Sequence, residues 1–368
     1  MIYLDNGATS FYKPRGVYEA VLEAMHRCAN PGRGGYDAAM NGAKTVYSCR
    51  ETAATLFGCE PEQVVFTPNC TQGLNIALHS LIRPGDRVLI SGFEHNAVTR
   101  TLRHLGASVY VAGRKLFDWN DTLSEFEKML RQGMDAAVFT HVSNVFGYVL
   151  PVGKMAALCR KYFVPFVIDA AQSAGTLRIN MEELGADFIA MPGHKGLLGP
   201  QGTGLLLCRD TPRPLITGGT GSDSINQEMP EYLPDRLEAG TQNVPGIAGL
   251  DAGLRHILRI GPENIFRREQ ELAQLCIAKL QKTGCKVFAG DHQAATISFV
   301  PDMDCEDLAE RLSREKIAVR AGLHCAPLAH ESAGTLESGT VRVSLGWNTT
   351  ERQILTFIST LEKCLQKP

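Results

Sequence analysis

Residues 165–196 read PFVIDAAQSAGTLRINMEELGADFIAMPGHKG, a stretch that contains two short apolar runs, each followed closely by polar residues. The runs are Pro165–Asp169 and Phe188–Met191, and both have the length and composition of buried strands. From about residue 60 to residue 208, runs of this kind alternate with segments of helical character. This alternation is typical of βαβ units, and it predicts an α/β fold with a mostly parallel sheet.

The strands of this sheet are expected at Val64–Thr67, Arg87–Ile90, Ser108–Val111, Ala136–Thr140, Pro165–Asp169, Phe188–Met191 and Gly204–Cys208. Apolar residues at helical spacing predict helices at Gln72–Leu81 and Gly153–Tyr162 between them. The segment Pro212–Pro245 is rich in Gly, Pro, Thr and Ser and follows neither period. We interpret it as an ordered excursion near the functional site or at an interface.

The pattern changes after about Pro262, where a long charged amphipathic helix to about Lys282 is expected. The elements expected after it are strands at Lys286–Phe288, Ala295–Val300, Ile317–Arg320 and Thr340–Ser344, and helices at Asp304–Glu315 and Thr350–Leu365. A chain of 368 residues exceeds the size at which one hydrophobic core usually stops growing. We therefore predict a large domain of residues 15–250 and a small α+β domain made of residues 1–14 and 251–368.

The composition is that of an ordinary globular protein, with 44% hydrophobic and 21% charged residues. A formal net charge of -2 gives no electrostatic reason to expect nucleic acid or a membrane as a partner, so a small-molecule substrate is expected. The start of the chain, MIYLDNGATS, has no basic leader, and neither a secretory signal nor a transit peptide is expected. Eleven scattered cysteines without a CxxC pair favour free thiols in the cytoplasm, and we predict neither a disulfide framework nor a metal site.

Asp169 and Lys195 are charged residues that directly follow predicted strands. Asp169 lies at the strand end where open α/β sheets bind ligands, and it either caps the next segment or holds a cationic partner. Lys195 lies in the segment Gly193-His194-Lys195-Gly196. Glycines on both sides are of no particular use to a surface lysine, but they give a bulky cofactor room to approach a lysine that forms a Schiff base.

The segment Thr67-Pro68-Asn69-Cys70-Thr71 leads from a predicted strand into a predicted helix. One interpretation is a turn with a helix N-cap. The other is a phosphate site, in which backbone N–H groups and a hydroxyl at the helix N-terminus bind the anion. Both interpretations stay open on these residues alone.

The order of these segments resembles that of fold-type I pyridoxal-phosphate (PLP) enzymes, specifically the class V aminotransferase family. Within that family it is similar to the SUF-type (group II) cysteine desulfurases and the selenocysteine lyases. The resemblance extends from the YLDNGAT motif at residues 3–9 to RVSL at residues 342–345, with several separate motifs in the family's order. It implies a homodimer in which a small domain carries a catalytic cysteine loop.

By this resemblance, Lys195 is the lysine that forms the Schiff base with PLP, Asp169 pairs with the pyridinium nitrogen, and Gln172 contacts the phenolic oxygen. His95 corresponds to the histidine stacked on the ring, although taken alone it could be an ordinary loop histidine. The remaining cofactor contacts implied are Cys70, Thr71 and His194 at the phosphate, Asn144 beside cofactor and substrate, and Thr241 at the phosphate of the neighbouring subunit.

The segment Arg320-Ala321-Gly322-Leu323-His324-Cys325-Ala326 is similar to the cysteine loop of the desulfurases. Most cysteines are small buried hydrophobic residues, but the glycine, histidine and arginine close before Cys325 indicate an exposed, electropositive loop that favours a thiolate. Arg342 resembles the arginine whose guanidinium fork binds the substrate carboxylate, with a surface salt bridge as the alternative. Arg320 is also assigned to the substrate site.

The activity implied is that of a PLP-dependent cysteine desulfurase, which converts L-cysteine to L-alanine and leaves the sulfur on Cys325 as a persulfide for a possible acceptor protein. A selenocysteine lyase, acting on L-selenocysteine and supplying selenium, would use the same residues. An aminotransferase or a β-eliminating cysteine lyase of this family would have no use for Cys325, and a non-catalytic binding protein would not need Lys195.

Two positions depart from the family pattern. Gly7 replaces a usual alanine, and Gly193 stands where many relatives carry a serine that binds the phosphate. The Gly-rich segment 217–222 is a candidate source of the missing hydrogen-bond donors.

Overall fold

The computed structural model describes residues 1–32, 34–209, 212–222 and 225–366. Its main sheet is formed by β2 (Val64–Thr67), β3 (Arg87–Ser91), β4 (Ser108–Ala112), β5 (Ala136–Thr140), β6 (Phe166–Asp169), β7 (Phe188–Pro192) and β8 (Gly204–Cys208). The strand order is β2-β8-β7-β6-β5-β3-β4. Only β8 runs antiparallel to its neighbours, so the prediction of a mostly parallel seven-stranded sheet is confirmed.

Both faces of this sheet are apolar, which is why its strands read as almost continuous hydrophobic runs. Along β6, Phe166 and Ile168 belong to one hydrophobic cluster and Val167 to another on the opposite face. Helices α3 (Cys70–Leu81) and α4 (Asn96–His104) cover the face of Val167. The other face packs against α2 (Asp37–Phe57), α5 (Trp119–Leu130), α6 (Val152–Lys161) and α8 (Val244–Ile260).

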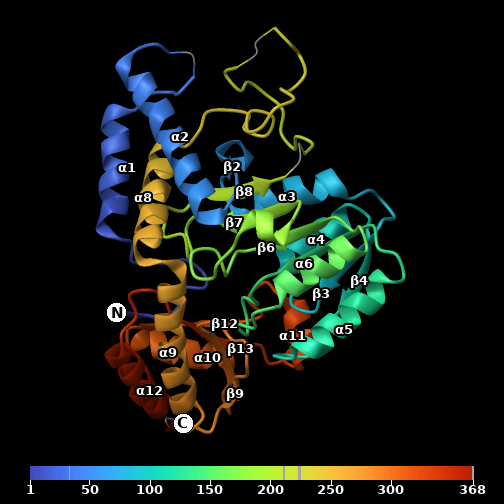
Figure 1. Ribbon diagram of the computed structural model, residues 1–368. Helices are drawn as coiled ribbons and strands as arrows, with labels where there is room; N and C mark the ends of the chain where they lie inside the picture. Colours follow the sequence, from blue (N-terminus) through green and yellow to red (C-terminus); the bar gives the residue numbers. More distant parts are fainter. Residues whose placement is uncertain (33, 210–211, 223–224, 367–368) are drawn as a thin grey trace.

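At one end of the sheet, α1 (Arg15–Arg27) lies beside α2 and α8 (Figure 1). A 3-10 turn, Pro61–Gln63, precedes β2, and the short helix α7 (Met181–Leu184) lies between β6 and β7. Within the described residues of 212–243, the chain contains turns and bends but neither helix nor strand. Whether this segment lies at an interface stays a prediction.

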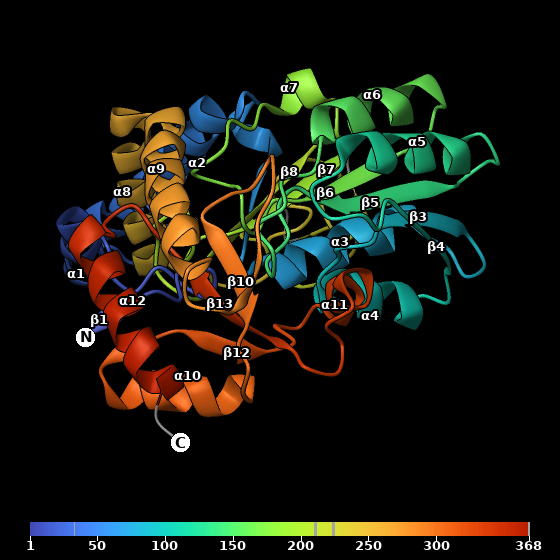
Figure 2. The same ribbon diagram turned by 90° about the horizontal axis from the view of Figure 1, so that it is seen from below.

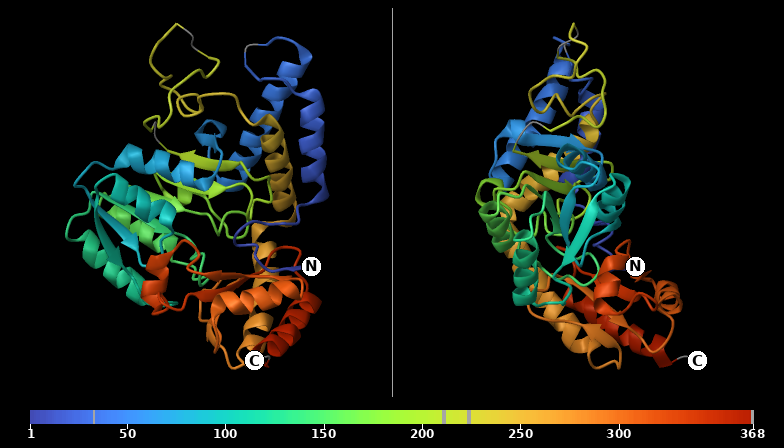
Figure 3. Two further views of the ribbon diagram at one scale, coloured as in Figure 1. Left: turned by 180° about the vertical axis from the view of Figure 1, so that it is seen from behind. Right: turned by 90° about the vertical axis from the view of Figure 1, so that its right-hand side faces the viewer.

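The C-terminal part builds a second, antiparallel sheet. Its elements are α9 (Pro262–Leu280), β9 (Lys286–Phe288), β10 (Thr296–Val300), α10 (Cys305–Arg314), β11 (Ile317–Ala318), β12 (Arg320–Gly322), α11 (Pro327–Ala333), β13 (Thr340–Ser344) and α12 (Glu351–Gln366). The order of the sheet is β12-β13-β10-β9, and α9, α10 and α12 pack on one face of it (Figure 2). The N-terminal strand β1 (Ile2–Tyr3) joins this part by pairing with β11, and Figure 3 shows both chain ends beside it.

The prediction of one strand at Ile317–Arg320 is wrong in one respect. The chain leaves the pair with β1 after Ala318 and enters the four-stranded sheet at Arg320, so two strands of different sheets replace one. The division of the chain at residue 250 stays a prediction, and α8 runs through that position. In the described part of the chain, no helix has the length and apolar content that a bilayer span requires.

The alternation of side chains along β13 has a direct consequence for the site. Val341 and Val343 enter the core beneath α9, α10 and α12, so Arg342 between them points to the opposite face. On that same face, the hydroxyl of Ser298 in β10 donates to the carbonyl of Val145 in the main-sheet part, at 2.6 Å. The second sheet therefore presents Arg342 toward the main sheet.

Candidate active site

The residues predicted to contact the cofactor follow the carboxyl ends of strands in the main sheet, which is where open α/β sheets bind ligands. They are Cys70 and Thr71 after β2, His95 after β3, Asn144 after β5, Asp169 at the end of β6, and Lys195 after β7. All these strands run in the same direction, so their carboxyl ends meet at one edge.

Lys195 lies in the tight turn that follows β7. Burial lowers the pKa of its ammonium group, and the nearby Arg342 guanidinium lowers it further, while the carboxylate of Asp169 opposes both effects. Its Nζ makes no hydrogen bond or ion pair within the residues that the structure describes. The amine of Lys195 therefore lies near the charges of Arg342 and Asp169 but forms no ion pair with either.

Asp169 is 3% exposed and lies at the end of β6. Its Oδ1 accepts a hydrogen bond from the backbone N–H of Ala171 at 2.8 Å and one from the thiol of Cys70 at 3.6 Å. Burial, together with the Asp169 carboxylate, raises the pKa of Cys70 well above its usual range, so this thiol stays protonated and donates. The local turn contact is confirmed, and the role of Asp169 toward a cationic partner stays a prediction.

The first turn of α3 has the geometry of an anion site. Asn69 caps the helix by accepting the N–H of Gln72 at 2.9 Å. The N–H groups of Cys70 and Thr71 donate to no acceptor in the described residues, and free N–H groups at a helix start favour an anion such as phosphate. The N-cap interpretation of residues 67–71 is confirmed, and the phosphate site stays a prediction.

His95 is the N-cap of α4, and its Nδ1 accepts the N–H of Ala97 at 3.0 Å. Burial lowers the pKa of this imidazole, and Lys195 and Arg342 lower it further against the opposing charge of Asp169. Because Nδ1 accepts a hydrogen bond, the neutral ring carries its proton on Nε2. The preceding Glu94 is buried; burial raises its pKa to about 8, and its Oε1 accepts hydrogen bonds from Ser91 and from the N–H of Thr140.

The cysteine loop is fixed against this edge by two hydrogen bonds. Asn144 donates through Nδ2 to the carbonyl of His324 at 2.7 Å, and the N–H of Asn96 donates to the carbonyl of Cys325 at 2.8 Å. Both loop residues have positive φ angles, 49° at His324 and 57° at Cys325, which L-residues rarely adopt. Such a conformation persists where surrounding contacts hold it, and it is often associated with function.

Cys325 differs from every other cysteine of the chain. All eleven lie in the described residues as free thiols, and Cys325 alone is exposed. Its neighbour His324 is held by Thr340, and burial lowers the pKa of the imidazole to about 3, so this ring is neutral and contributes no charge. Arg320 lies at the start of the same loop, and its guanidinium is paired with Asp5.

Arg342 is 3% exposed, so the alternative of a surface salt bridge is wrong. Its Nη1 donates to the carbonyl of Asn144 at 2.9 Å, and its Nη2 donates to Oδ1 of Asp5 at 2.8 Å. Asp5 also binds Arg320 through both of its oxygens. The sequence interpretation did not assign Asp5 to the site; the available signal was a carboxylate directly after the apolar residues Ile2–Leu4.

Two residues that are predicted to contact the cofactor form hydrogen bonds with the N-terminal segment. Gln172 donates through Nε2 to the carbonyl of Gly7 at 3.0 Å. His194 contacts the Thr9 hydroxyl through Nδ1 at 3.1 Å, which leaves its Nε2 available, and burial lowers its pKa to about 4. Thr241 is exposed and lies in the wall of a cavity of about 250 Å³ that Pro68 and Gln72 also line.

The surroundings of Gly193 explain why this position holds a glycine. A Cβ at this position would lie 2.1 Å from Oγ1 and 3.0 Å from Cβ of Thr203. Thr203 is buried, and its hydroxyl donates to the carbonyl of Pro200 at 2.6 Å. Thr203 thus occupies the volume that a serine at position 193 would need.

We predict that Gly193→Ser destabilises the protein by about 1–3 kcal/mol through overpacking. Gly193→Ser combined with Thr203→Ala is expected to recover most of this loss, because the second change removes the hydroxyl that clashes. Chemical denaturation of both variants and of Thr203→Ala alone measures the coupling. Additive losses in the double variant would contradict this account.

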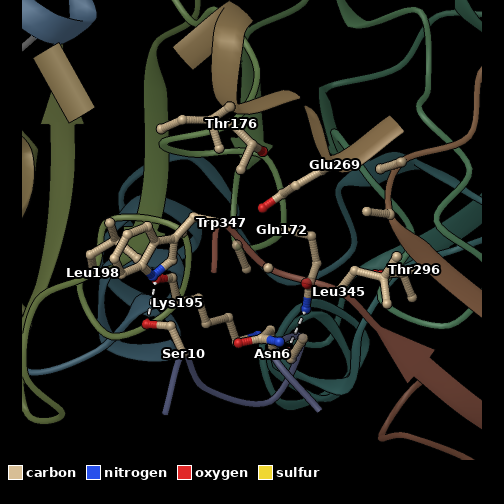
Figure 4. A pocket seen from close by; sticks show the side chains of 17 residues that line it. Asn6, Ser10, Gln172, Thr176, Lys195, Leu198, Glu269, Thr296, Leu345 and Trp347 are labelled. Carbon is tan, nitrogen blue, oxygen red and sulfur yellow. Dashed lines mark hydrogen bonds between the residues drawn. The ribbon is translucent and has the colours of Figure 1, made fainter. Parts of the chain in front are cut away.

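A small cavity of about 60 Å³ lies beside the site, lined among others by Lys195, Gln172 and Glu269. Figure 4 shows the carboxylate of Glu269, from α9, directed into this cavity. Glu269 is 8% exposed, and burial raises its pKa to about 8. No hydrogen bond to its side chain exists within the described residues, so a protonated carboxyl is favoured at neutral pH.

We predict that Glu269→Gln removes a pH-dependent loss of stability. The folded state raises the pKa of this carboxyl, so it holds a proton that the unfolded chain has already released, and stability falls as pH rises from about 4.5 to about 8. The variant and the wild type should be similar at pH 4.5 and differ at pH 8.5 by on the order of 2–4 kcal/mol in favour of the variant. Glu362→Gln, on the exposed face of α12, is the control; an equal difference at both pH values would contradict the prediction.

The comparisons with known proteins identify the family of this chain. The sequence profile of the aminotransferase class-V family matches residues 2–357. A probable cysteine desulfurase from Pyrococcus abyssi is 31% identical over 389 residues, which cover 100% of this chain and 94% of that protein. Another, from Methanothermobacter thermautotrophicus, is 31% identical over 378 residues and covers 98% of this chain and 94% of its own length.

The structure of a cysteine desulfurase from Thermococcus onnurineus has a TM-score of 0.91 and 32% identity to this chain, with 99% of this chain and 94% of that one covered. A cysteine desulfurase structure from Escherichia coli, with a TM-score of 0.85, 24% identity and coverage of 99% of this chain and 94% of that one, shares the fold. On its matched length and its identity to these relatives, the chain belongs to the class-V aminotransferase family and is a homologue of its cysteine desulfurases.

Proposed function

We propose that this protein is a PLP-dependent cysteine desulfurase that converts L-cysteine to L-alanine and receives the sulfur on Cys325 as a persulfide. The observation that carries the proposal is the position of Cys325: it is the exposed thiol, and Asn144 and Asn96 hold its loop against the strand ends that carry Lys195 and Asp169. An aminotransferase would need the lysine and the aspartate but not this thiol.

The residues present fit PLP. The buried carboxylate of Asp169 suits a protonated ring nitrogen, because a buried charge needs an opposite partner. The free N–H groups of Cys70 and Thr71 suit the phosphate, and the amine of Lys195, with its lowered pKa, suits a Schiff base. His95 would lie against the ring, and Gln172 and His194 would complete the cofactor contacts. When bound, PLP acts as an electron sink that accepts the electron pair left at the substrate Cα.

The protein residues then have distinct tasks. Arg342 would bind the substrate carboxylate, with Asn144 fixing the guanidinium from behind through its carbonyl. Lys195 would accept the Cα proton of the substrate at Nζ, and its lowered pKa suits this role as a base. Asp169 would keep the ring nitrogen of the cofactor protonated. The Cys325 thiolate would attack the substrate sulfur; the S–S bond forms as the Cβ–S bond breaks, and its electron pair returns to the substrate, which becomes alanine after protonation. Arg320 is the cation available to stabilise the thiolate.

L-Selenocysteine is the alternative substrate, since the same residues would serve it. Selenium leaves more readily, so its release would depend less on Cys325. Measuring alanine from both amino acids, with the wild type and with Cys325→Ala, separates the two activities. A desulfurase loses the cysteine reaction in the variant, whereas a dedicated selenocysteine lyase retains its main reaction.

Arg342→Lys is expected to raise KM for L-cysteine by about tenfold or more with a smaller effect on kcat, because an ammonium group cannot form the two-pronged contact of a guanidinium. Arg352→Lys, on the exposed surface of α12, is the matched control. Steady-state kinetics of both variants provide the test. An unchanged KM in a folded Arg342→Lys variant would remove Arg342 from the substrate site.

We also propose a homodimer. Tyr18, Leu22 and Met25 form an apolar face on α1 that is 52%, 58% and 66% exposed, more than a lone subunit usually leaves uncovered. Thr241 is exposed and would reach the phosphate of the second subunit. Sedimentation should give the mass of two chains, and Thr241→Ala should weaken retention of PLP during dialysis. A monomer that holds PLP fully would contradict the proposal.

The eleven free thiols favour a reducing compartment, and we propose a cytoplasmic location. The exposure of Cys325 and of Leu323 beside it would allow an acceptor protein to approach the persulfide.

A further inference from the structure

Glu269 is an acidic residue on the buried face of α9. The other buried residues of this face are apolar, namely Ile265, Leu272, Ala273, Cys276 and Leu280. Glu269 thus occupies a position where an apolar side chain is expected. Its carboxyl is directed into the cavity of about 60 Å³ beside the turn of Lys195 (Figure 4). It is 8% exposed and has no hydrogen-bond partner in the described residues, which is rare for a buried polar group.

The charge of Glu269 has no protein partner either. Lys195 is the other titratable residue that lines the cavity. Burial alone raises the pKa of Glu269, so neither the ammonium of Lys195 nor any other described cation offsets its charge. A buried carboxylate without an opposite charge is costly, and Glu269 therefore holds either a proton or a cation.

Neutral oxygen atoms line the same cavity. Gln172 donates through Nε2 to the carbonyl of Gly7 at 3.0 Å. Asn6 donates through Nδ2 to the carbonyl of Ser344 at 3.1 Å. These contacts fix the orientation of both amides and leave their side-chain oxygens without a hydrogen bond in the described residues. The hydroxyl of Thr176 adds a third oxygen, and its proton goes to a backbone carbonyl. Hard cations prefer carboxylate, amide and hydroxyl oxygens of this kind.

The charge and the volume of the cavity favour a monovalent cation. Ca²⁺ is usually held by several carboxylates, whereas this cavity offers a single one, which one positive charge neutralises. A water-sized occupant needs roughly 10–15 Å³ of such a volume, so about 60 Å³ holds an ion with a few waters. No three His, Cys, Asp or Glu side chains of the described residues come together to hold a metal, so this is not a transition-metal site.

We propose that this cavity binds a monovalent alkali cation, with Glu269 as its charged ligand. The ion would join α9 of the C-terminal part to the segment that follows β6 in the main-sheet part, through Thr176 and Gln172. The inference does not depend on the proposed reaction, because it is tested by the stability of the protein and by the position of the ion.

Unfolding temperatures of the wild-type holoenzyme test the site. They are measured at about pH 8.5 in KCl, in NaCl and in choline chloride of equal ionic strength. The choline cation is too large for the cavity. KCl or NaCl should therefore raise the unfolding temperature by about 2–4 °C relative to choline chloride, because a ligand that binds only the folded state stabilises that state. At about pH 5 the folded state holds a proton on Glu269, so the three salts should give the same temperature.

Glu269→Gln removes the charged ligand but keeps its shape, and Glu271→Gln on the exposed face of the same helix is the matched control. The salt effect should vanish in Glu269→Gln and persist in Glu271→Gln. In choline chloride, the wild type and Glu269→Gln should show the full difference in stability predicted above, and KCl or NaCl should reduce it. Equal temperatures of the wild type in the three salts at about pH 8.5, or a salt effect of the same size in Glu269→Gln, would overturn the proposal.

A crystal of the wild-type holoenzyme grown in RbCl at the same pH locates the ion without any variant. Rb⁺ is a monovalent alkali cation that scatters X-rays anomalously, so an anomalous peak is expected in the cavity beside the carboxylate of Glu269. A cavity that contains only water would show no such peak and would contradict the proposal.

Discussion

Replacement of Cys325 with alanine is expected to reduce the formation of L-alanine from L-cysteine by at least about 10²-fold, because the reaction loses its nucleophile. No other described cysteine is exposed, so none can substitute for it. Lys195, Asp169 and Arg342 remain in place in the variant. Cofactor content, measured from the visible spectrum, should therefore equal that of the wild type.

Cys285→Ala is the matched control, since this thiol is partly exposed and packs against the core of the second sheet. It should retain the activity of the wild type. If Cys325→Ala instead kept its alanine production from L-cysteine, the protein would be better described as a lyase or aminotransferase of the same family.

Lys195→Ala is expected to lose both turnover, by at least about 10³-fold, and covalent attachment of the cofactor. Attachment is measured independently of activity: borohydride reduction of the wild type with PLP, followed by peptide mapping, should place the pyridoxyl group on Lys195. In the variant the label should be absent.

Lys13 is the informative competitor in this experiment. Its Nζ donates to the Ser10 hydroxyl and to the carbonyl of His194, and burial lowers its pKa to about 8, so it is also a reactive amine near the cofactor turn. Lys13→Arg should leave the label on Lys195. A label that moves to, or starts on, Lys13 would show that the cofactor lysine has been misidentified.

The main sheet could be predicted from the sequence because short stretches of consecutive residues mark its strands. Except for the edge strand β4, whose first two residues are exposed, the strands are buried on both faces and read as short apolar runs, as in Phe166–Asp169. Asp169 and Lys195 lie at or just after the ends of such runs. Because the carboxyl ends of parallel strands lie at the same edge of a sheet, both residues could be expected at that edge.

Helix α8 shows where the local signal fails. It contains glycines that permit close packing: a Cβ at Gly249 would lie 2.7 Å from Val21 of α1, and one at Gly253 would lie 2.4 Å from the carbonyl of Leu197. Glycine is a poor helix former, so the same residues that fit the helix into the fold conceal it in the sequence.

The contact between Asp5 and Arg342 could not be predicted for a different reason. Asp5 and Arg342 are separated by 337 positions, and their contact depends on the pairing of β1 with β11 and of β12 with β13. Similarly, the exclusion of a serine at Gly193 depends on Thr203, which only the antiparallel return of β8 brings close. Contacts of this kind arise from tertiary structure and leave no periodic signal.

The most direct test of the central claim is to treat the wild-type holoenzyme with one equivalent of L-cysteine per subunit, without an added reductant, and to locate the transferred sulfur by peptide mass spectrometry. The account predicts one added sulfur on the peptide that contains Cys325, in an amount equal to the L-alanine formed. An added sulfur on the peptide of another cysteine, or alanine formed without any protein-bound sulfur, would contradict it.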